Sequence, residues 1–147
     1  MYPSSLVMTV VPARTAGVGE IVVATPADEA GAIHPLLLGA AGVLEVDALL
    51  VAGGAQAIGA LAFGWDEETT GDEAAFAPVD RIVGPGNAWV TAAKLEVAGF
   101  IGIDLPAGPS EGMVLADDSA DPVIVAADLV TQAEHGPDSP AILVTTS

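Results

Sequence analysis

Cysteine is absent from the 147 residues of this chain. Its absence excludes disulfide bonds and any zinc site built on thiolates, and it fits a cytoplasmic location. Basic residues are also scarce: three Lys and Arg face twenty Asp and Glu, for a net charge of −17. Such a surface repels nucleic acid and anionic lipid, so we expect neither as a partner. The acidity indicates either ordinary solubility or adaptation to high salt, where screening removes the self-repulsion.

Aromatic residues are few as well, at 4%, whereas hydrophobic residues make up 52%. Small aliphatic side chains must therefore build the core, which suits helices packed closely on a sheet. The uncharged run from Ala48 to Trp65 is long enough to raise the question of a transmembrane helix. Gly53-Gly54 divides this run and acidic residues flank it, so a buried strand, a turn and a helix explain it better. The N-terminus also lacks the basic region of a signal peptide, so we expect no membrane association.

Apolar runs and turn signals predict alternating helices and strands along the chain. Strands at this spacing, each separated by a helix, are typical of βαβ units and of a parallel sheet. The Pro/Gly-rich segment Leu105 to Ser110 is the best candidate for a domain boundary. The expected helices span 4–16, 33–44, 55–63, 88–97 and 122–135, and the expected strands span 21–24, 48–52, 81–83, 100–103, 113–116 and 141–144.

Two glycine turns, Gly53-Gly54 and Gly84-Pro85-Gly86, each join a predicted strand to a predicted helix. Glycine lets the backbone approach a ligand closely, and a helix N-terminus offers free N–H groups. Gln56 and Asn87 place a side-chain amide at these two turns, able to donate and to accept hydrogen bonds. The alternative is an ordinary turn with no ligand, which is the usual reason for glycine before a helix.

Gln132 and His135 lie three residues apart near the end of the last predicted helix, so we expect them to share a face. Imidazole is the commonest zinc ligand, and a glutamine carbonyl oxygen is an unusual but possible one. The alternative is a solvated helix end, where a histidine interacts favourably with the helix dipole. Zinc needs four ligands, and the only other histidine, His34, is interpreted as structural. Any further ligands must therefore lie elsewhere.

Ser110 follows a tight Gly-Pro loop, where its hydroxyl is placed for substrate binding. No His or Asp is spaced to activate it as a nucleophile, so binding is favoured over attack. The acidic segment 66–78 could suggest a cation site, but a solvated surface loop is the simpler interpretation.

Several strings of this chain, taken together and in order, resemble histidinol dehydrogenase. GPGN, AGPSE and QAEH carry the resemblance, because their joint occurrence in this order is highly specific. The similar strings are YPSSLVM (Tyr2 to Met8), GGAQAIGALAFG (Gly53 to Gly64), RIVGPGNAWVTAAK (Arg81 to Lys94), GIDLPAGPSEGMVLAD (Gly102 to Asp117) and AADLVTQAEHGPDSPAILVT (Ala126 to Thr145).

The resemblance implies NAD and Zn²⁺ as cofactors and oxidation of L-histidinol to L-histidine through the aldehyde. It implies that Gln132 and His135 bind zinc and substrate, that Ser110 binds substrate, and that Gln56 and Asn87 contact NAD. It also implies a homodimer with sites shared between subunits. The fold implied is an incomplete Rossmann-like parallel sheet flanked by helices in 1–107, forming a nucleotide-binding lobe. Residues 108–147 would begin a second α/β lobe that carries the substrate and zinc residues.

The chain departs from the family in its length, since members are roughly three times as long. The resemblance implies that the family's catalytic Glu–His pair, the remaining Asp and His zinc ligands, and a further NAD-contacting tyrosine match no residue of this chain. We therefore expect no catalytic residue in this chain, negligible dehydrogenase activity and weak zinc affinity for the chain alone. The alternatives are a non-catalytic nucleotide-binding module and one half of a split enzyme.

Overall fold

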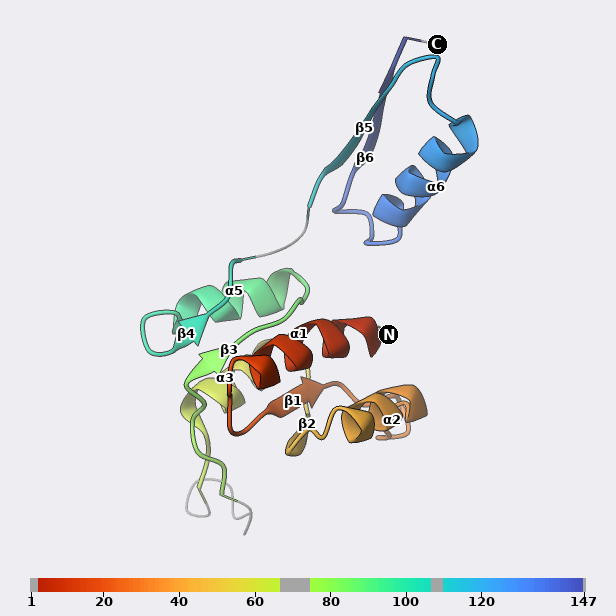
Figure 1. The fold of residues 1–147 in the computed structure, drawn as a ribbon. Helices are drawn as coiled ribbons and strands as arrows, with labels where there is room; N and C mark the ends of the chain where they lie inside the picture. The colour runs from red at the N-terminus through yellow and green to blue at the C-terminus, as the bar shows by residue number, and fades with distance from the viewer. Residues whose placement is uncertain (1–2, 67–74, 107–109, 147) are drawn as a thin grey trace. The chain divides into compact units, whose positions relative to one another are not determined.

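A computed structural model describes residues 3–66, 75–106 and 110–146. The chain divides into two compact units, Met1–Pro106 and Ala107–Ser147 (Figure 1). Across the described residues there are five helices and six short strands, all of the paired strands being parallel. The protein is therefore of the mixed α/β class, as the alternating pattern predicts.

The first unit alternates helices and strands along its whole length. Most helices begin or end where the sequence signals it: a proline opens α2, glycines flank α3, and Asn87 precedes α5. The imidazole Nδ1 of His34 accepts a hydrogen bond from the N–H of Leu36 (3.2 Å), so His34 caps α2. The elements of this unit are α1 (Pro3–Thr15), β1 (Val22–Thr25), α2 (Pro35–Val43), β2 (Ala48–Val51), α3 (Gly54–Phe63), β3 (Arg81–Ile82), α5 (Ala88–Val97) and β4 (Gly102–Ile103).

The strands of the first unit form two separate hydrogen-bonded pairs. β1 pairs with β2 and β3 pairs with β4, but within the described ranges no ladder joins the two pairs. The parallel pairing predicted from the sequence is confirmed. Over the residues that the structure describes, the strands form separate pairs rather than one continuous sheet, and β3 and β4 contribute only two paired residues each.

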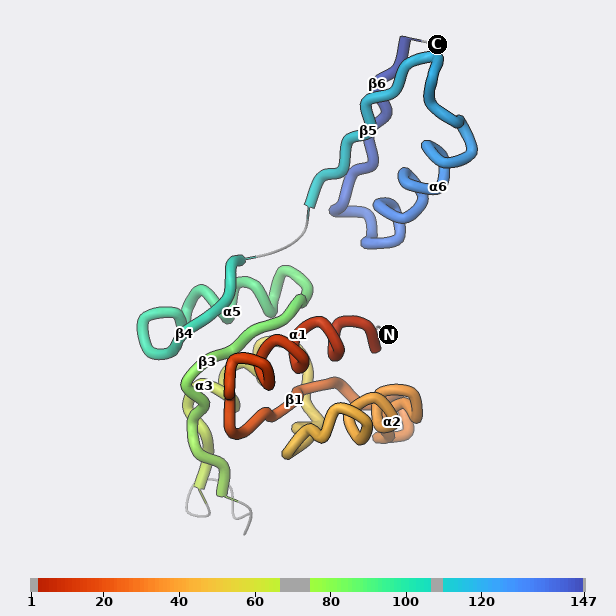
Figure 2. The backbone as a smooth tube through the Cα atoms, viewed as in Figure 1, coloured from red at the N-terminus to blue at the C-terminus, as the bar shows by residue number. Residues whose placement is uncertain are grey.

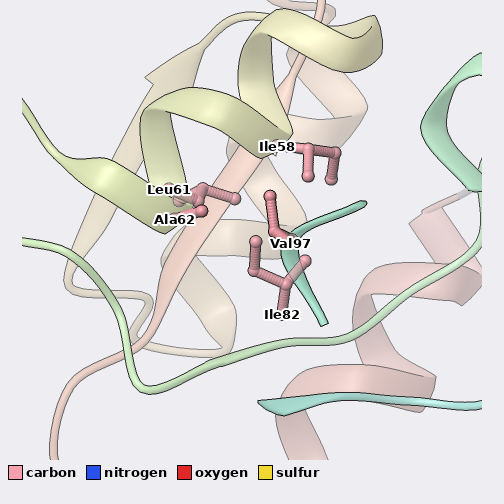
Figure 3. Packing of buried hydrophobic residues seen from close by; sticks show 5 residues of the cluster. All are labelled: Ile58, Leu61, Ala62, Ile82 and Val97. Atoms are coloured by element: carbon pink, nitrogen blue, oxygen red, sulfur yellow. The ribbon is translucent and has the colours of Figure 1, made fainter. Parts of the chain in front are cut away.

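Two apolar clusters hold the first unit together. The larger one joins α3, β3 and α5 through buried side chains, and half-buried residues of β1, β2 and β4 pack against it. A smaller cluster, of Leu6, Val10 and Ala41, joins α1 to α2. Figure 3 shows the buried members of the larger cluster, Ile58, Leu61, Ala62, Ile82 and Val97.

The second unit is a single βαβ motif. Its backbone runs through β5 (Gly112–Ala116), crosses over by α6 (Pro122–Ala133), and returns in β6 (Ala141–Thr145) beside β5 (Figure 2). The carboxylate of Asp121 caps α6 by accepting the N–H of Val123 (2.8 Å). Along residues 110–146 the only buried side chain is that of Ser139.

One face of the β5–β6 pair carries exposed apolar side chains. Met113 lies opposite Ile142, and Leu115 lies opposite Val144. Their exposed fractions are 64% and 81% for the β5 residues, and 38% and 43% for the β6 residues. Parallel sheets are normally covered on both faces. The helix α6 packs on this pair, yet the motif buries no hydrophobic side chain in the described part of the unit.

The predicted acidic loop lies largely outside the described residues, which resume at residue 75. Trp65 and Phe76, on either side of the gap, form an antiparallel bridge and stack with ring centroids 4.7 Å apart. In the described part of the chain no helix is both long and apolar enough to cross a membrane.

Candidate functional site

The first glycine turn connects β2 to α3. Gly53 is the N-cap residue of α3, and it makes no side-chain capping hydrogen bond to this helix. The amide oxygen Oε1 of Gln56 lies over the turn, 2.8 Å from the position that a Cβ on Gly54 would occupy. Backbone N–H groups and one exposed side-chain amide therefore meet at this helix N-terminus. This chemistry suits an anionic or polar ligand.

The second glycine turn connects β3 to α5. The amide oxygen Oδ1 of Asn87 accepts the N–H of Val90 (3.1 Å), so Asn87 is the N-cap residue of α5. This bond engages the oxygen of the amide, whose Nδ2 group can only donate. Asn87 can therefore donate to a ligand but offers little as an acceptor.

Lys94 and Asp104 support the second turn, and the sequence interpretation did not identify them as functional. The ammonium of Lys94 forms an ion pair with Asp104 and donates to the carbonyl of Gly84 (3.1 Å). Asp104 in turn accepts the N–H of Gly84 (2.8 Å). Burial opposes the charged form of Asp104, but the Gly84 N–H and Lys94 outweigh it and hold the pKa of this carboxyl below its ordinary value.

The second unit brings Ser110 and Gln132 together. The amide Nε2 of Gln132 donates to the backbone carbonyl of Ser110 (2.8 Å), just before β5 begins. Gly112 makes room for this contact, since an added Cβ would lie 2.6 Å from both Cγ and Cδ of Gln132. A carbonyl only accepts, so the contact fixes which side of the amide faces it. Oε1 of Gln132 is then the group left to act as a ligand.

The position of His135 corrects the sequence interpretation in part. α6 ends at Ala133 with Glu134 as its C-cap, so His135 lies in the following turn rather than on the helix. The helix ends here because Gly136 adopts a φ of 116°, which breaks the helical path. The backbone N–H of His135 still donates to the carbonyl of Gln132 (3.2 Å). His135 is therefore adjacent to Gln132, and its imidazole is exposed.

The predicted residues thus fall into two groups, one in each unit. Gln56 and Asn87 stand at the first turns of α3 and α5, which pack against each other. Ser110, Gln132 and His135 gather at the amino-terminal edge of the β5–β6 pair. This edge is opposite to the carboxyl edge, where ligands usually bind to open parallel sheets. Two surface hollows of the second unit lie at that carboxyl edge, around Ala116 and Asp117, and neither is lined by any of these three residues.

The donor set fits zinc only in part. Gln132 and His135 supply at most two of the four ligands that zinc takes in proteins. Within the described ranges, no group of three or more His, Asp or Glu side chains is placed to hold a metal ion. The glycine turns fit a dinucleotide better, because exposed amides and helix N-termini need no cation to bind phosphate.

These features define an α/β protein with polar groups and glycine turns at the ends of parallel strands, a class that includes many dinucleotide-dependent enzymes. The sequence profile of histidinol dehydrogenase matches residues 1–147. The chain therefore belongs to the histidinol dehydrogenase family.

Individual relatives agree with this assignment. Histidinol dehydrogenase of Methanosarcina mazei is 49% identical over 146 residues, which cover 99% of this chain and 32% of the relative. The enzyme of Mycobacterium tuberculosis is 53% identical over an alignment of 149 residues, which covers 100% of this chain and 33% of the relative. The crystal structure of histidinol dehydrogenase from Elizabethkingia anophelis superposes with a TM-score of 0.84 at 46% identity, over 99% of this chain and 32% of that one. The chain thus spans about a third of the length of the relatives it matches.

Proposed function

We propose that this chain supplies a dinucleotide-binding portion and part of the metal-and-substrate pocket of a histidinol dehydrogenase. The reaction would be the oxidation of L-histidinol to L-histidine, with NAD as the hydride acceptor. Gln56 and the Nδ2 group of Asn87 would contact NAD, and the first turns of α3 and α5 would face its phosphates. The Rossmann-like character of residues 1–107, the homodimer and the cytoplasmic location belong to the same proposal, because they come from the family resemblance.

The observation that carries this proposal is the contact between Gln132 and Ser110. Ser110 holds the amide nitrogen of Gln132 through its backbone carbonyl, which leaves the amide oxygen as the group that can act as a ligand, and His135 follows three residues later with its backbone N–H bonded to the Gln132 carbonyl. An acceptor oxygen and an imidazole are what a zinc ion with a histidinol ligand would require from this side of the pocket. The hydroxyl of Ser110 would bind the substrate on the same edge. We assign the acid–base pair of the family to no residue of this chain, so the chain would orient the substrate rather than take up its proton.

A chimera tests this assignment. We would replace the corresponding third of the Mycobacterium tuberculosis relative with this chain and follow NADH formation from histidinol. The chimera should be active, and Gln132→Ala or His135→Ala should reduce kcat/KM at least about a hundredfold, the scale of losing a metal ligand or its close support. Glu134→Gln is the matched control, because Glu134 lies between them and is exposed. Full activity of both ligand variants would refute their roles.

The isolated chain provides the complementary test. We expect no NADH from histidinol with the 147-residue protein, and turnover there would contradict the proposal. A second candidate function is a non-catalytic nucleotide-binding module. It is favoured by the first unit, which holds both glycine turns and all of the buried hydrophobic residues found in the described ranges. Saturable NAD binding in calorimetry, without turnover even in the chimera, would support the module.

A further inference from the structure

Lys94 occupies an unusual environment for a lysine. It is one of three basic residues in the chain, and it is only 4% exposed. Burying an ammonium group is costly unless it is paired and hydrogen-bonded. Lys94 meets this requirement with two partners, the carboxylate of Asp104 and the carbonyl of Gly84.

The two charged side chains close a ring around one glycine. Asp104 accepts the N–H of Gly84, and Lys94 donates to the carbonyl of the same residue. Both polar groups of Gly84 are therefore held, one by each member of the ion pair. Gly84 has a φ of 127°, a conformation that other residues rarely adopt, and it stands three residues before the α5 cap Asn87.

Stability alone does not account for this arrangement. Replacing a buried ion pair with apolar side chains of similar volume is often neutral or stabilising, so the pair is a poor way to strengthen a core. It does hold a backbone segment in one conformation, which an apolar pair cannot do. The segment held here leads directly to Asn87 and the N-terminus of α5.

We propose that Lys94 and Asp104 are positioning residues, which fix the turn Gly84–Asn87 in the conformation that presents Asn87 and the first turn of α5 to a dinucleotide. The pair itself need not touch the ligand. This inference rests on the proposed dinucleotide site, so its test separates the order of the turn from the binding of NAD.

The experiment uses the whole 147-residue chain and three measurements. Amide hydrogen exchange by NMR reports the order of the turn, thermal unfolding reports stability, and calorimetric titration reports NAD affinity. The first variant is Asp104→Asn, which keeps the shape of the side chain but removes its charge. The second is the double variant Lys94→Met/Asp104→Leu, which removes both charges and leaves neither one unpaired. The matched control is Asp47→Asn, because Asp47 also joins a backbone N–H, that of Ile21 (2.7 Å), to a cation, Arg14 (2.7 Å), but far along the chain from the turn.

In both variants we expect the amide hydrogens of Gly84, Gly86 and Asn87 to exchange at least about tenfold faster, and NAD to bind about tenfold more weakly. The double variant should regain most of its thermal stability without regaining affinity. Asp47→Asn should change neither exchange at the turn nor affinity. If Asp104→Asn does not fold, the double variant alone still yields all three measurements.

Three results would overturn the inference. Unchanged exchange at the amides of Gly84, Gly86 and Asn87 would show that the pair does not hold the turn. Faster exchange with unchanged NAD affinity would show that the pair has only a structural role. NAD affinity that recovers together with thermal stability in the double variant would also show a purely structural role. A wild-type chain that binds no NAD would instead refute the proposed dinucleotide site and, with it, the purpose assigned to the pair, while the exchange data still decide whether the pair orders the turn.

Discussion

Gly112→Ala probes the contact between Gln132 and the Ser110 loop without altering either residue. The new methyl group would lie 2.6 Å from Cγ and Cδ of Gln132 and 2.9 Å from its Oε1. Gln132 must then hold a side-chain torsion about 30° away from a rotamer, which costs about 0.5–1.5 kcal/mol, and it loses its bond to Ser110, worth about 0.5–1.5 kcal/mol. Replacing glycine by alanine also lowers the conformational entropy of the unfolded chain, which stabilises the folded state by about 0.4–1 kcal/mol. The net expectation is a loss of about 1 kcal/mol in the stability of the β5–β6 pair.

A double-mutant cycle with Gln132→Ala makes this test decisive. Without the longer side chain, nothing obstructs the methyl group, so Gly112→Ala should become neutral or stabilising by up to about 1 kcal/mol. Local opening free energies from amide exchange in β5 are the readout, because they report this unit separately from the first one. An equal loss of stability in both backgrounds would show that the methyl group meets something other than Gln132.

Three further predictions concern the first unit and the charge of the chain. Asn87→Ala should cost about 1 kcal/mol of stability, because α5 loses its cap. Asn87→Asp should keep the cap and still weaken NAD binding in calorimetry. Equal NAD affinity in Asn87→Asp and in the unsubstituted chain would argue against a donor role for Nδ2. The Ile21 N–H and then Arg14 lower the pKa of Asp47, so its contribution to stability is present above about pH 4 and is lost as pH falls toward the lowered value; in acid unfolding curves Asp47→Asn should therefore show a shallower decline, and identical curves would contradict this assignment. Because the net charge is −17, added KCl should raise the melting temperature, and a flat response would mean that charge repulsion does not limit stability.

The sequence predicts most of the elements because their signals are local. Asn87 directly precedes a run of helix formers, and the structure confirms it as the cap of α5. Strand pairing depends on distant partners, which is why the predicted 81–83 and 100–103 strands shrink to two paired residues each. The end of α6 was misplaced by two residues, since the conformation of Gly136 cannot be read from its neighbours alone.

The sequence also gives no direct sign of contacts that join separate segments. The bond from Gln132 to the Ser110 carbonyl spans 22 positions and involves a backbone atom, so residue types do not reveal it. For Lys94 and Asp104 the sequence does offer a weak indication. The chain has three basic residues, so a single lysine in an Ala-rich helix and an aspartate directly after a strand could have been proposed as an ion pair. The zinc and NAD roles depend on the family resemblance, because neither spacing nor geometry alone defines four ligands or a bound dinucleotide.

The apolar face made by Met113, Leu115, Ile142 and Val144 has a practical consequence for handling the protein. Exposed apolar strands of this kind promote aggregation, and the electrostatic repulsion between molecules of net charge −17 opposes it. Concentrated salt screens that repulsion. A buffer with enough salt to raise the melting temperature would therefore also favour precipitation. These two effects together limit the range of ionic strength that suits purification.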